Sequence, residues 1–375
     1  MWSYRSLSRI DFRVIPVILA LMMISLLVIS ANTWNEMAHP SFFTPVVKQQ
    51  IRWFVVGWIV YFLVAGFDYN KLREWTWPLY GLMIILLIGL FFTDPIQRVQ
   101  RWYKIPGINI SFQPSEYAKL AVVIALSWYL ERRSQDSHTL GTAFFSGIIV
   151  GIPFILILKQ PDLGTALVLF PIALVMCYFG NIHPTIIKLM AWSGAAVLLI
   201  ISVLFLEVVT HEQIRPYATK VLKEYQFDRL NPHTHHQKAA VTAIAIGGMS
   251  GKGWGKSEFT GGGWLPAPYT DSVYPAFGEE FGFLGLLVLM GLFYSLIYFS
   301  FQVSVVANSG FGRLLSAGIA VYLAIHIVIN VGMMSGMLPI TGVPLLLVTY
   351  GGSSILSTMA ALGLLQSVYS RRYMF

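Results

Sequence analysis

The strongest constraint on this chain is the recurrence of long apolar runs from one end to the other. Of its 375 residues, 56% are hydrophobic and only 11% are charged, whereas ordinary globular domains carry roughly a quarter charged residues. A membrane-spanning helix needs about 20 mostly apolar residues. Because such runs recur along the whole chain, they leave no room for a separate water-soluble catalytic domain. The sequence therefore predicts an all-α polytopic membrane protein.

Ten runs are long and apolar enough to be read as spanning helices. The first follows three arginines, as in a signal peptide, but it is long enough to span and no small-residue cleavage site comes after it. We therefore count it as a span and predict a single transmembrane domain over residues 1–375. The ten predicted spans are residues 14–31, 51–67, 76–93, 115–130, 143–158, 163–180, 185–209, 280–302, 313–334 and 344–368.

The basic residues orient these predicted spans. An even number of spans places both termini on one side, and the loops and tails of that side carry eleven of the 25 Lys and Arg residues. Seven others lie elsewhere around the spans, and the last seven lie in one long polar segment that the positive-inside rule omits. We therefore expect cytoplasmic termini. The net charge of +8 fits contact with anionic membrane lipids, and we expect no nucleic-acid partner.

The long polar segment runs from Thr210 to about Phe277, between predicted helices seven and eight. Its first part has apolar and charged residues at helical spacing, which predicts a short amphipathic helix. Its second part is rich in glycine and proline and contains Trp254 and Trp264. Loops longer than about 12 to 15 residues are usually functional or disordered. The two tryptophans favour an ordered loop that packs against the helices.

Ionisable residues within or at the edge of spans are costly and are therefore candidates for function. In QPSEYAK, Glu116 and Lys119 are three residues apart and share one helix face, so we expect them to pair. A purely structural ion pair that locks two helices together is an equal alternative. In KQPDLGTA, Asp162 precedes a helix, where an aspartate is either a simple cap or a functional acid.

Three more acidic residues lie in PYTDSVYPAFGEEFGFLG. Glu279 and Glu280 fall where the eighth predicted span begins, and acidic side chains suit the first turn of a helix, so a structural role is favoured for at least one of them. Asp271 lies outside the spans on a proline-flanked turn, where neither a helix cap nor a helical ion pair explains it. A carboxylate at the membrane surface above a polar cavity is suited to act as a general base on a lipid-borne substrate.

Two other patterns are weaker. His233, His235 and His236 in PHTHH resemble a metal-binding tract, but neighbouring histidines on one loop cannot complete a metal site alone. Gly351 and Gly352 in TYGGSS resemble a phosphate cradle. Between apolar spans, close helix packing explains such a glycine pair better.

Six stretches follow one another in a recognisable order along nearly the whole chain. They are QRWYKIPGINISFQPSEYAKLA, KQPDLGTAL, RLNP, IAIGGMSGKGWG, WLPAPYTDSVYPAFGEEFGFLG and GMLPITGVPLLLVTYGGSS. Together with ten spans and a long loop between spans seven and eight, they resemble the SEDS family (shape, elongation, division and sporulation). Six motifs in register make this resemblance highly specific. The short N-terminus and the compact length of 375 residues resemble its RodA branch more than its FtsW branch.

The resemblance implies a peptidoglycan glycosyltransferase in the bacterial cytoplasmic membrane. Such an enzyme polymerises lipid II into a growing glycan strand on the outer face, for cell-wall elongation and rod shape, beside a class B penicillin-binding protein that acts as transpeptidase. The alternatives are a septal polymerase of the FtsW branch, a lipid II flippase and a non-catalytic scaffold. A transporter typically shows internal repeats, and this sequence shows none.

The resemblance also implies roles for individual residues. The Thr-Asp pair of the family's long loop places the catalytic aspartate at Asp271, although Ser272 and Pro275 depart from the residues that usually follow it. The family's Arg-Trp motif matches Arg101 and Trp102, and Arg101 is the expected pyrophosphate-binding residue, with a divalent cation, Mg²⁺ or Mn²⁺, as a further candidate. We expect the substrate cavity to include Arg101, Glu116, Lys119, Asp162, Lys252, Glu279 and Glu280.

Overall fold

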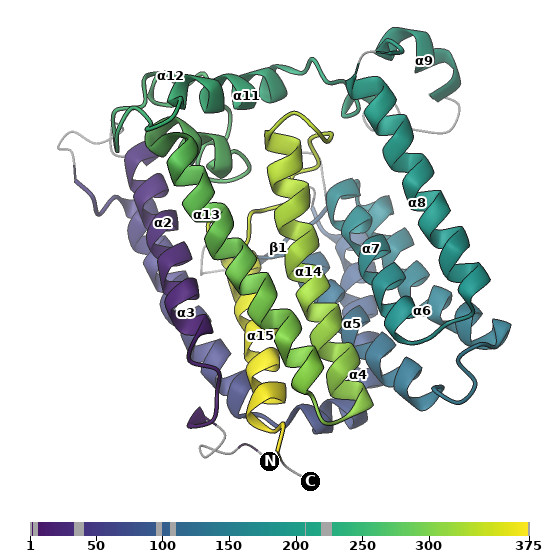
Figure 1. Ribbon diagram of the computed structural model, residues 1–375. Coiled ribbons are helices and arrows are strands. Elements are labelled where there is room, and N and C mark those ends of the chain that lie inside the picture. Colours follow the sequence, from purple (N-terminus) through teal and green to yellow (C-terminus); the bar gives the residue numbers. More distant parts are fainter. Residues whose placement is uncertain are drawn as a thin grey trace.

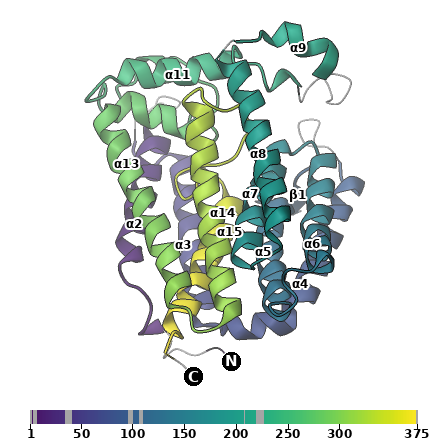
Figure 2. The ribbon, with the colours of Figure 1, turned by 45° about the vertical axis from the view of Figure 1, so that its right-hand side comes forward.

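The computed structural model describes residue 2 and residues 7–33, 41–94, 100–105, 110–206, 208–218 and 227–373. In this part of the chain, long helices run roughly side by side as a bundle, and short helices lie across one end of it (Figure 1). The turned view shows the same arrangement, with α9 and α11 above the bundle (Figure 2). The start of α2 and the end of α15 both lie at the opposite end (Figure 1).

Ten long helices build the described bundle. Two short 3-10 turns, Tyr69–Lys71 and Leu90–Phe92, flank the third of them. The ten helices are α2 Val14–Thr33, α3 Pro45–Gly66, α4 Leu72–Gly89, α5 Pro114–Arg132, α6 Leu140–Lys159, α7 Leu163–Phe179, α8 Pro184–Phe205, α13 Val273–Val306, α14 Gly310–Met334 and α15 Gly352–Ser370.

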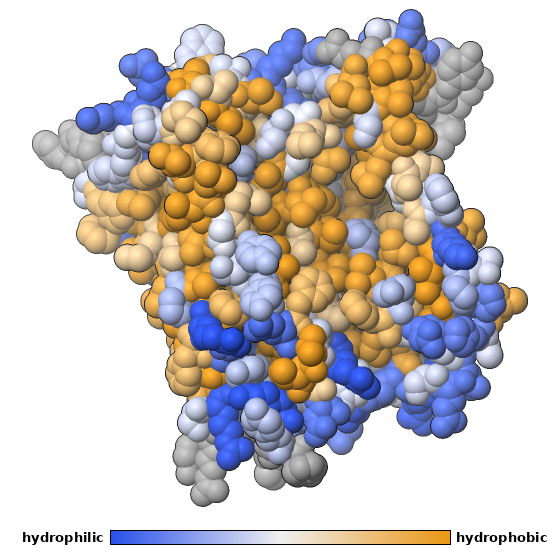
Figure 3. All heavy atoms as spheres, viewed as in Figure 1, coloured by the Kyte–Doolittle hydropathy of each residue, from blue (hydrophilic) through white to orange (hydrophobic). Residues whose placement is uncertain are grey.

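Seven of the described helices are long and apolar enough to cross a membrane by length and composition: α2, α3, α4 with its flanking turns, α6, α8, α13 and α14. The surface has a matching apolar band between two more polar ends (Figure 3). The prediction of an all-α polytopic membrane protein is therefore confirmed. The count of ten spans stays a prediction, because α7 is shorter and because α5 and α15 lie mostly buried inside the bundle.

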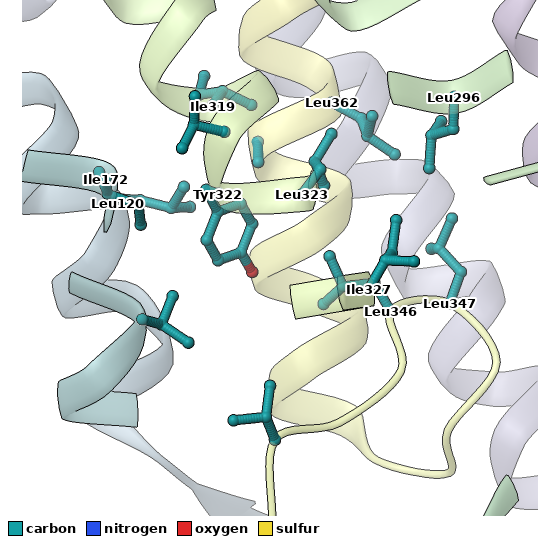
Figure 4. Close-up of a cluster of buried hydrophobic side chains, with 14 of the residues drawn as sticks. Leu120, Ile172, Leu296, Ile319, Tyr322, Leu323, Ile327, Leu346, Leu347 and Leu362 are labelled. Carbon is teal, nitrogen blue, oxygen red and sulfur yellow. The ribbon is translucent and has the colours of Figure 1, made fainter. Parts of the chain in front are cut away.

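The apolar core is centred on α14, which packs against α5, α7, α13 and α15. Gly318 permits a close approach, since a Cβ at this position would lie 2.7 Å from Val123 of α5 and 2.8 Å from Met176 of α7. The buried side chains around Tyr322 fill the space between these helices (Figure 4). They include Leu120, Ile172, Ile319, Leu323 and Ile327. A polar group on the buried faces of α14 must therefore find its partners within this core.

The tenth predicted span begins too early. Residues 335–351 form a non-helical segment, and α15 begins only at Gly352. Residues 345–349 are all buried, and Leu347 has a φ of 65°, in the left-handed region. Pro344 lacks a backbone N–H to donate to a helix. The predicted helix is therefore wrong for residues 344–351, whose apolar character reflects burial inside the protein.

A small β-hairpin precedes α5. Strand β1 (Tyr103–Ile105) pairs antiparallel with β2 (Ile110–Phe112), and Tyr103 lies opposite Phe112. The hairpin packs against α15 and follows directly on Arg101 and Trp102. The sequence did not predict it, since strands of three residues are too short to show a period of two.

The long polar segment is folded in its described part. It contains α9 (His211–Ala218), α11 (His235–Gly247) and α12 (Glu258–Gly261). A helix is present at the start of the predicted amphipathic stretch, but Val221, Leu222 and Tyr225 lie outside the described residues. The Trp254 indole N–H donates to the Leu27 carbonyl at 3.0 Å, which confirms an ordered loop packed on α2, whereas Trp264 is largely exposed.

Helix α13 is kinked near its start. Gly282 has φ 65° and ψ −167°, and a Cβ at this position would lie 2.3 Å from the Gly251 nitrogen. Only glycine adopts this conformation at low cost. The turns before the kink carry Glu279 and Glu280, so these residues lie in a short helical segment above the long part of α13. The prediction that a continuous span begins at residue 280 is wrong in this respect.

Candidate functional site

A polar cavity of about 380 Å³ lies where the hairpin meets the starts of α5, α7 and α15. The loop before α13 and the 335–351 segment complete its wall. The structure brings four of the predicted site residues, and Trp102, to this one cavity. Its ionisable lining residues are Arg101, Glu116, Asp162 and Asp271.

Asp271 lies two residues before α13, on a loop fixed from both sides. On one side, the Ser272 N–H donates to the Ala267 carbonyl at 3.0 Å, and the Ser272 hydroxyl lies 2.6 Å from Nε2 of His236. On the other side, the loop is bound by the 335–351 segment. The Tyr350 N–H donates to the carbonyl of residue 269, and the Thr349 hydroxyl donates to the carbonyl of residue 270. The loop therefore holds the Asp271 carboxylate in a defined place. Ser272, which departs from the family pattern, is part of this support.

The surroundings make Asp271 a stronger base than an exposed aspartate. Burial raises the pKa of its carboxyl above the ordinary value, and His236, Arg229 and Arg101 oppose this effect. Burial also lowers the pKa of His236, with Asp271 acting in the opposite direction. A carboxylate with a raised pKa in a cleft is typical of a general base.

Arg101 and Asp162 join the hairpin to the start of α7. Their charged groups are 3.9 Å apart, and the Arg101 side chain is 14% exposed. The guanidinium also donates to the carbonyls of Gln160 and Pro161. Asp162 Oδ1 accepts from the Thr165 N–H at 3.3 Å, so Asp162 is the N-cap of α7. It lines the cavity as well, so the cap is confirmed and a functional role for Asp162 stays a prediction.

Asp162 is also linked to α5. Its Oδ2 accepts from the Gln113 amide at 3.3 Å and from the Ser115 hydroxyl at 3.4 Å. The Trp102 indole N–H donates to the side-chain amide oxygen of Gln113 (Oε1) at 3.2 Å. These contacts fix one polar wall of the cavity, on which the Arg101 guanidinium lies beside the Asp162 carboxylate.

Glu116 and Lys119 form the predicted ion pair, with 2.8 Å between Nζ and Oε1. Both partners of the pair lie on α5, and a further contact of Lys119 joins the pair to α14, so the structural alternative stays open beside the functional one. Lys119 is fully buried, and its Nζ also lies 2.8 Å from Nε2 of His326 on α14. Sequence reasoning missed His326. A histidine inside the predicted span 313–334 was the signal, since ionisable residues in spans are functional candidates.

Four predicted cavity residues do not line the cavity: Lys119, Lys252, Glu279 and Glu280. The Glu279 carboxylate accepts from the N–H groups of Phe259 and Thr260 at 2.8 and 2.9 Å, and from the Thr260 hydroxyl. The backbone N–H groups of Lys252 and Gly253 donate to the carbonyls of Glu279 and Glu280, both at 2.9 Å. These contacts tie the glycine-rich loop to the start of α13, which fits a structural role.

The histidine tract forms no metal site in the described structure. His236 contacts Ser272, and within the described ranges no three His, Cys, Asp or Glu side chains group closely enough to hold a metal. We therefore assign no step to the Mg²⁺ or Mn²⁺ ion considered from the sequence. Gly352 packs against the Trp53 ring, where a Cβ would lie 2.5 Å from a ring carbon, as the packing interpretation predicts. A Cβ at Gly351 would meet open space, and both glycines line the cavity.

Nearly the whole chain is similar to known proteins. Residues 11–374 match the family model FTSW_RODA_SPOVE, described as "Cell cycle protein". The peptidoglycan glycosyltransferase MrdB of Escherichia coli K12 is 28% identical, over 97% of this chain and 95% of the relative. The peptidoglycan glycosyltransferase RodA of Treponema pallidum is 29% identical, over 98% and 99%. A probable peptidoglycan glycosyltransferase FtsW of Trichlorobacter lovleyi is 29% identical, over 86% and 83%.

Two solved structures share the fold. A chain from a structure titled "Structural coordination of polymerization and crosslinking by a peptidoglycan synthase complex" superposes with a TM-score of 0.75 at 26% identity, over 98% of this chain and 99% of that one. The rod shape determining protein RodA of Thermus thermophilus superposes with a TM-score of 0.70 at 24% identity, over 98% of both chains. The helix arrangement is thus shared over almost the whole length.

Proposed function

This chain belongs to the SEDS family of FtsW, RodA and SpoVE proteins, and we propose that it is a peptidoglycan glycosyltransferase that polymerises lipid II in the bacterial cytoplasmic membrane. The names of its relatives support the activity. The observation that carries the proposal is the polar cavity that unites a half-buried aspartate of raised pKa with an arginine. A base and a cation are the two groups that this reaction requires.

The reaction joins a sugar hydroxyl to an anomeric carbon that carries undecaprenyl pyrophosphate. Pyrophosphate leaves readily, so the protein has little need of a strong general acid. Asp271 takes the proton from the 4-hydroxyl of the acceptor lipid II sugar while that oxygen attacks the anomeric carbon of the growing strand. The new glycosidic bond forms as the bond to pyrophosphate breaks, which inverts the donor carbon.

Arg101 neutralises the negative charge of the departing pyrophosphate. Its guanidinium lines the cavity and is only 14% exposed, so a phosphate oxygen there meets a charge with little competing water. Hydrogen bonds between charged groups are about twice as strong as neutral ones. Asp162 and the carbonyls of residues 160 and 161 hold the guanidinium in place.

The cavity works on the outer face of the membrane. It lies at the beginning of α15, and the end of α15 lies with the start of α2 at the opposite end of the bundle (Figure 1). With cytoplasmic termini, as the basic residues favour, Asp271 is extracytoplasmic. The partner is a class B penicillin-binding protein. The solved peptidoglycan synthase complex supports this partnership.

The cellular role that we propose is cell-wall elongation and rod shape. Relatives named MrdB and RodA that align over 97% and 98% of this chain support it, as does the shared fold with a rod shape determining protein. A septal role, as in the FtsW branch, predicts instead that depletion makes cells filament without rounding. Depletion followed by microscopy separates the two roles.

Purified protein with labelled lipid II tests the activity. We expect glycan strands to lengthen in detergent, and to lengthen further with a class B penicillin-binding protein. A flippase would move labelled lipid II across a vesicle membrane without lengthening any strand. A scaffold would do neither, and either of these results would refute the proposed function.

A further inference from the structure

His326 is an ionisable residue inside the apolar core of the bundle. It is fully buried on α14, and its ring lies 4.8 Å from that of Tyr322, a centre of the core shown in Figure 4. Its Nε2 lies 2.8 Å from Nζ of Lys119, and that Nζ lies 5.4 Å from the Tyr322 ring. A buried ammonium group is costly unless its protons are paired. His326 supplies one of the two hydrogen-bond partners of Lys119 in the described structure.

The chemistry of the pair determines which atom donates. A protonated lysine has three N–H donors and no acceptor, so Nε2 of His326 must accept and the ring must carry its proton on Nδ1. In the described part of the chain, Nδ1 has no partner of good geometry, although the backbone of Pro344 approaches the ring. His326 therefore acts as a fixed acceptor for Lys119.

The position of His326 links two walls of the catalytic cavity. On one side, Lys119 holds Glu116, which lines the cavity. On the other side, Pro344 and Gly342 of the 335–351 segment line it too. A Cβ at Gly342 would lie 3.8 Å from Oδ2 of Asp271. The His326 imidazole therefore lies between Glu116 on one wall and the 335–351 segment on the other. Gly342 of that segment lies close to Asp271.

The ion pair alone would leave Lys119 under-coordinated. Glu116 Oε1 accepts one of its protons, and Oε2 of the same carboxylate has no partner among the described residues. We propose that His326 is a positioning residue, which fixes Nζ of Lys119 against Glu116 and so holds the Glu116 carboxylate at the cavity wall. The effect on turnover rests on the proposed function. The effect on the position of Lys119 is independent of that function.

Two variants separate hydrogen bonding from bulk. His326→Leu keeps a buried side chain of similar size but offers no acceptor, so Lys119 loses a partner and Glu116 shifts. We expect kcat for lipid II polymerisation to fall roughly 10- to 100-fold, as small misplacements do, with little change in KM. His326→Gln offers an amide oxygen as acceptor and should restore most of kcat.

A matched control and a second readout guard against unfolding. Ser316→Ala, on the same buried helix, removes a hydroxyl whose one hydrogen bond among the described residues is to the Gly312 carbonyl of that helix, and should leave activity and thermal stability unchanged. Amide hydrogen exchange at the start of α5, measured by mass spectrometry on each purified full-length variant, reports without any turnover how firmly Lys119 is held to α14. We expect slow exchange in wild type and His326→Gln, and faster exchange in His326→Leu.

The outcomes are distinct. Full activity and wild-type exchange at the start of α5 in His326→Leu would overturn the inference, as would a His326→Gln variant as impaired as His326→Leu. If His326→Leu does not fold, His326→Asn replaces it, since its shorter amide should also fail to reach Lys119. A wild-type protein that makes no glycan would refute the proposed function, and the exchange pattern would still decide the role of His326.

Discussion

The buried pair of Glu116 and Lys119 permits a quantitative test by a double-mutant cycle. Their side chains are 3% and 0% exposed, and removing one partner of a buried pair costs about 3–5 kcal/mol, because the other charge is left unpaired. Lys119→Met removes the partner of Oε1 of Glu116, while Oε2 already has none in the described structure. We therefore expect a loss of about 4 kcal/mol for this variant.

The second single variant should cost less. After Glu116→Gln, Lys119 keeps His326 at 2.8 Å, and the loss is about 1.5–3 kcal/mol, typical of one hydrogen bond to a charged group. The double variant buries no charge, so it should be more stable than Lys119→Met alone. The coupling energy between the two positions is then about 2 kcal/mol or more.

Thermal unfolding in detergent, followed by circular dichroism, measures these differences. Lys119→Met should lower Tm on the order of 5 to 10 °C, and the double variant should recover part of that loss. Recovered stability should not restore polymerisation, because the cavity wall has lost its carboxylate. Additive losses, or a double variant less stable than Lys119→Met, would refute the electrostatic account of the pair.

Three further predictions concern the loop and its aspartate. Polymerisation rates should fall as the pH drops through a value above 3.8, because burial raises the pKa of Asp271 and a protonated carboxyl accepts no proton. The Arg101 charge opposes this rise of the pKa. In Arg101→Gln the acid limb of the pH–rate profile should therefore move to higher pH. Glu279→Ala removes the acceptor of three hydrogen bonds and should destabilise the fold by about 3 kcal/mol, with faster proteolysis within residues 252–264 and a milder effect for Glu279→Gln. Gly282→Ala places a Cβ 2.3 Å from a backbone nitrogen at a φ of 65°, and should lower Tm more than Gly291→Ala, where a Cβ meets open space.

The helical bundle was largely predictable because hydropathy reports directly on burial or lipid contact. The same signal failed at residues 344–351, where apolar side chains are buried by neighbouring helices while the backbone is not helical. Hydropathy cannot distinguish an apolar segment that is buried inside the protein from an apolar helix that faces lipid. Nor could it detect the hairpin at residues 103–112, because each strand has only three residues.

The site was predictable in its residue types and only partly in its arrangement. Spacing predicted the pairing of Glu116 with Lys119, since residues three apart share a helix face. The convergence of Asp271 with Arg101 and Asp162 joins segments far apart in the chain, and only the family resemblance indicated it. Motif membership alone also suggested Glu279 and Lys252, which the fold uses away from the cavity.

His326 is the converse case, a buried ionisable residue that the sequence reasoning overlooked. It belongs to no motif that we recognised, and its partner is 207 residues earlier in the chain. Its place in an apolar run was the available signal, because an ionisable side chain in such a run needs a buried partner. The sequence alone could not indicate that this partner is Lys119.

The most direct test of the central claim is lipid II polymerisation by purified Asp271→Asn beside wild type. The substitution keeps the size of the side chain but removes the base, and the rate should fall by about 10²- to 10⁴-fold, with Tm unchanged. Asp136→Asn is the matched control, since Asp136 is an exposed aspartate outside the cavity, and it should polymerise at the wild-type rate. Glycan strands made by Asp271→Asn at the wild-type rate would contradict the assignment of Asp271 as the base.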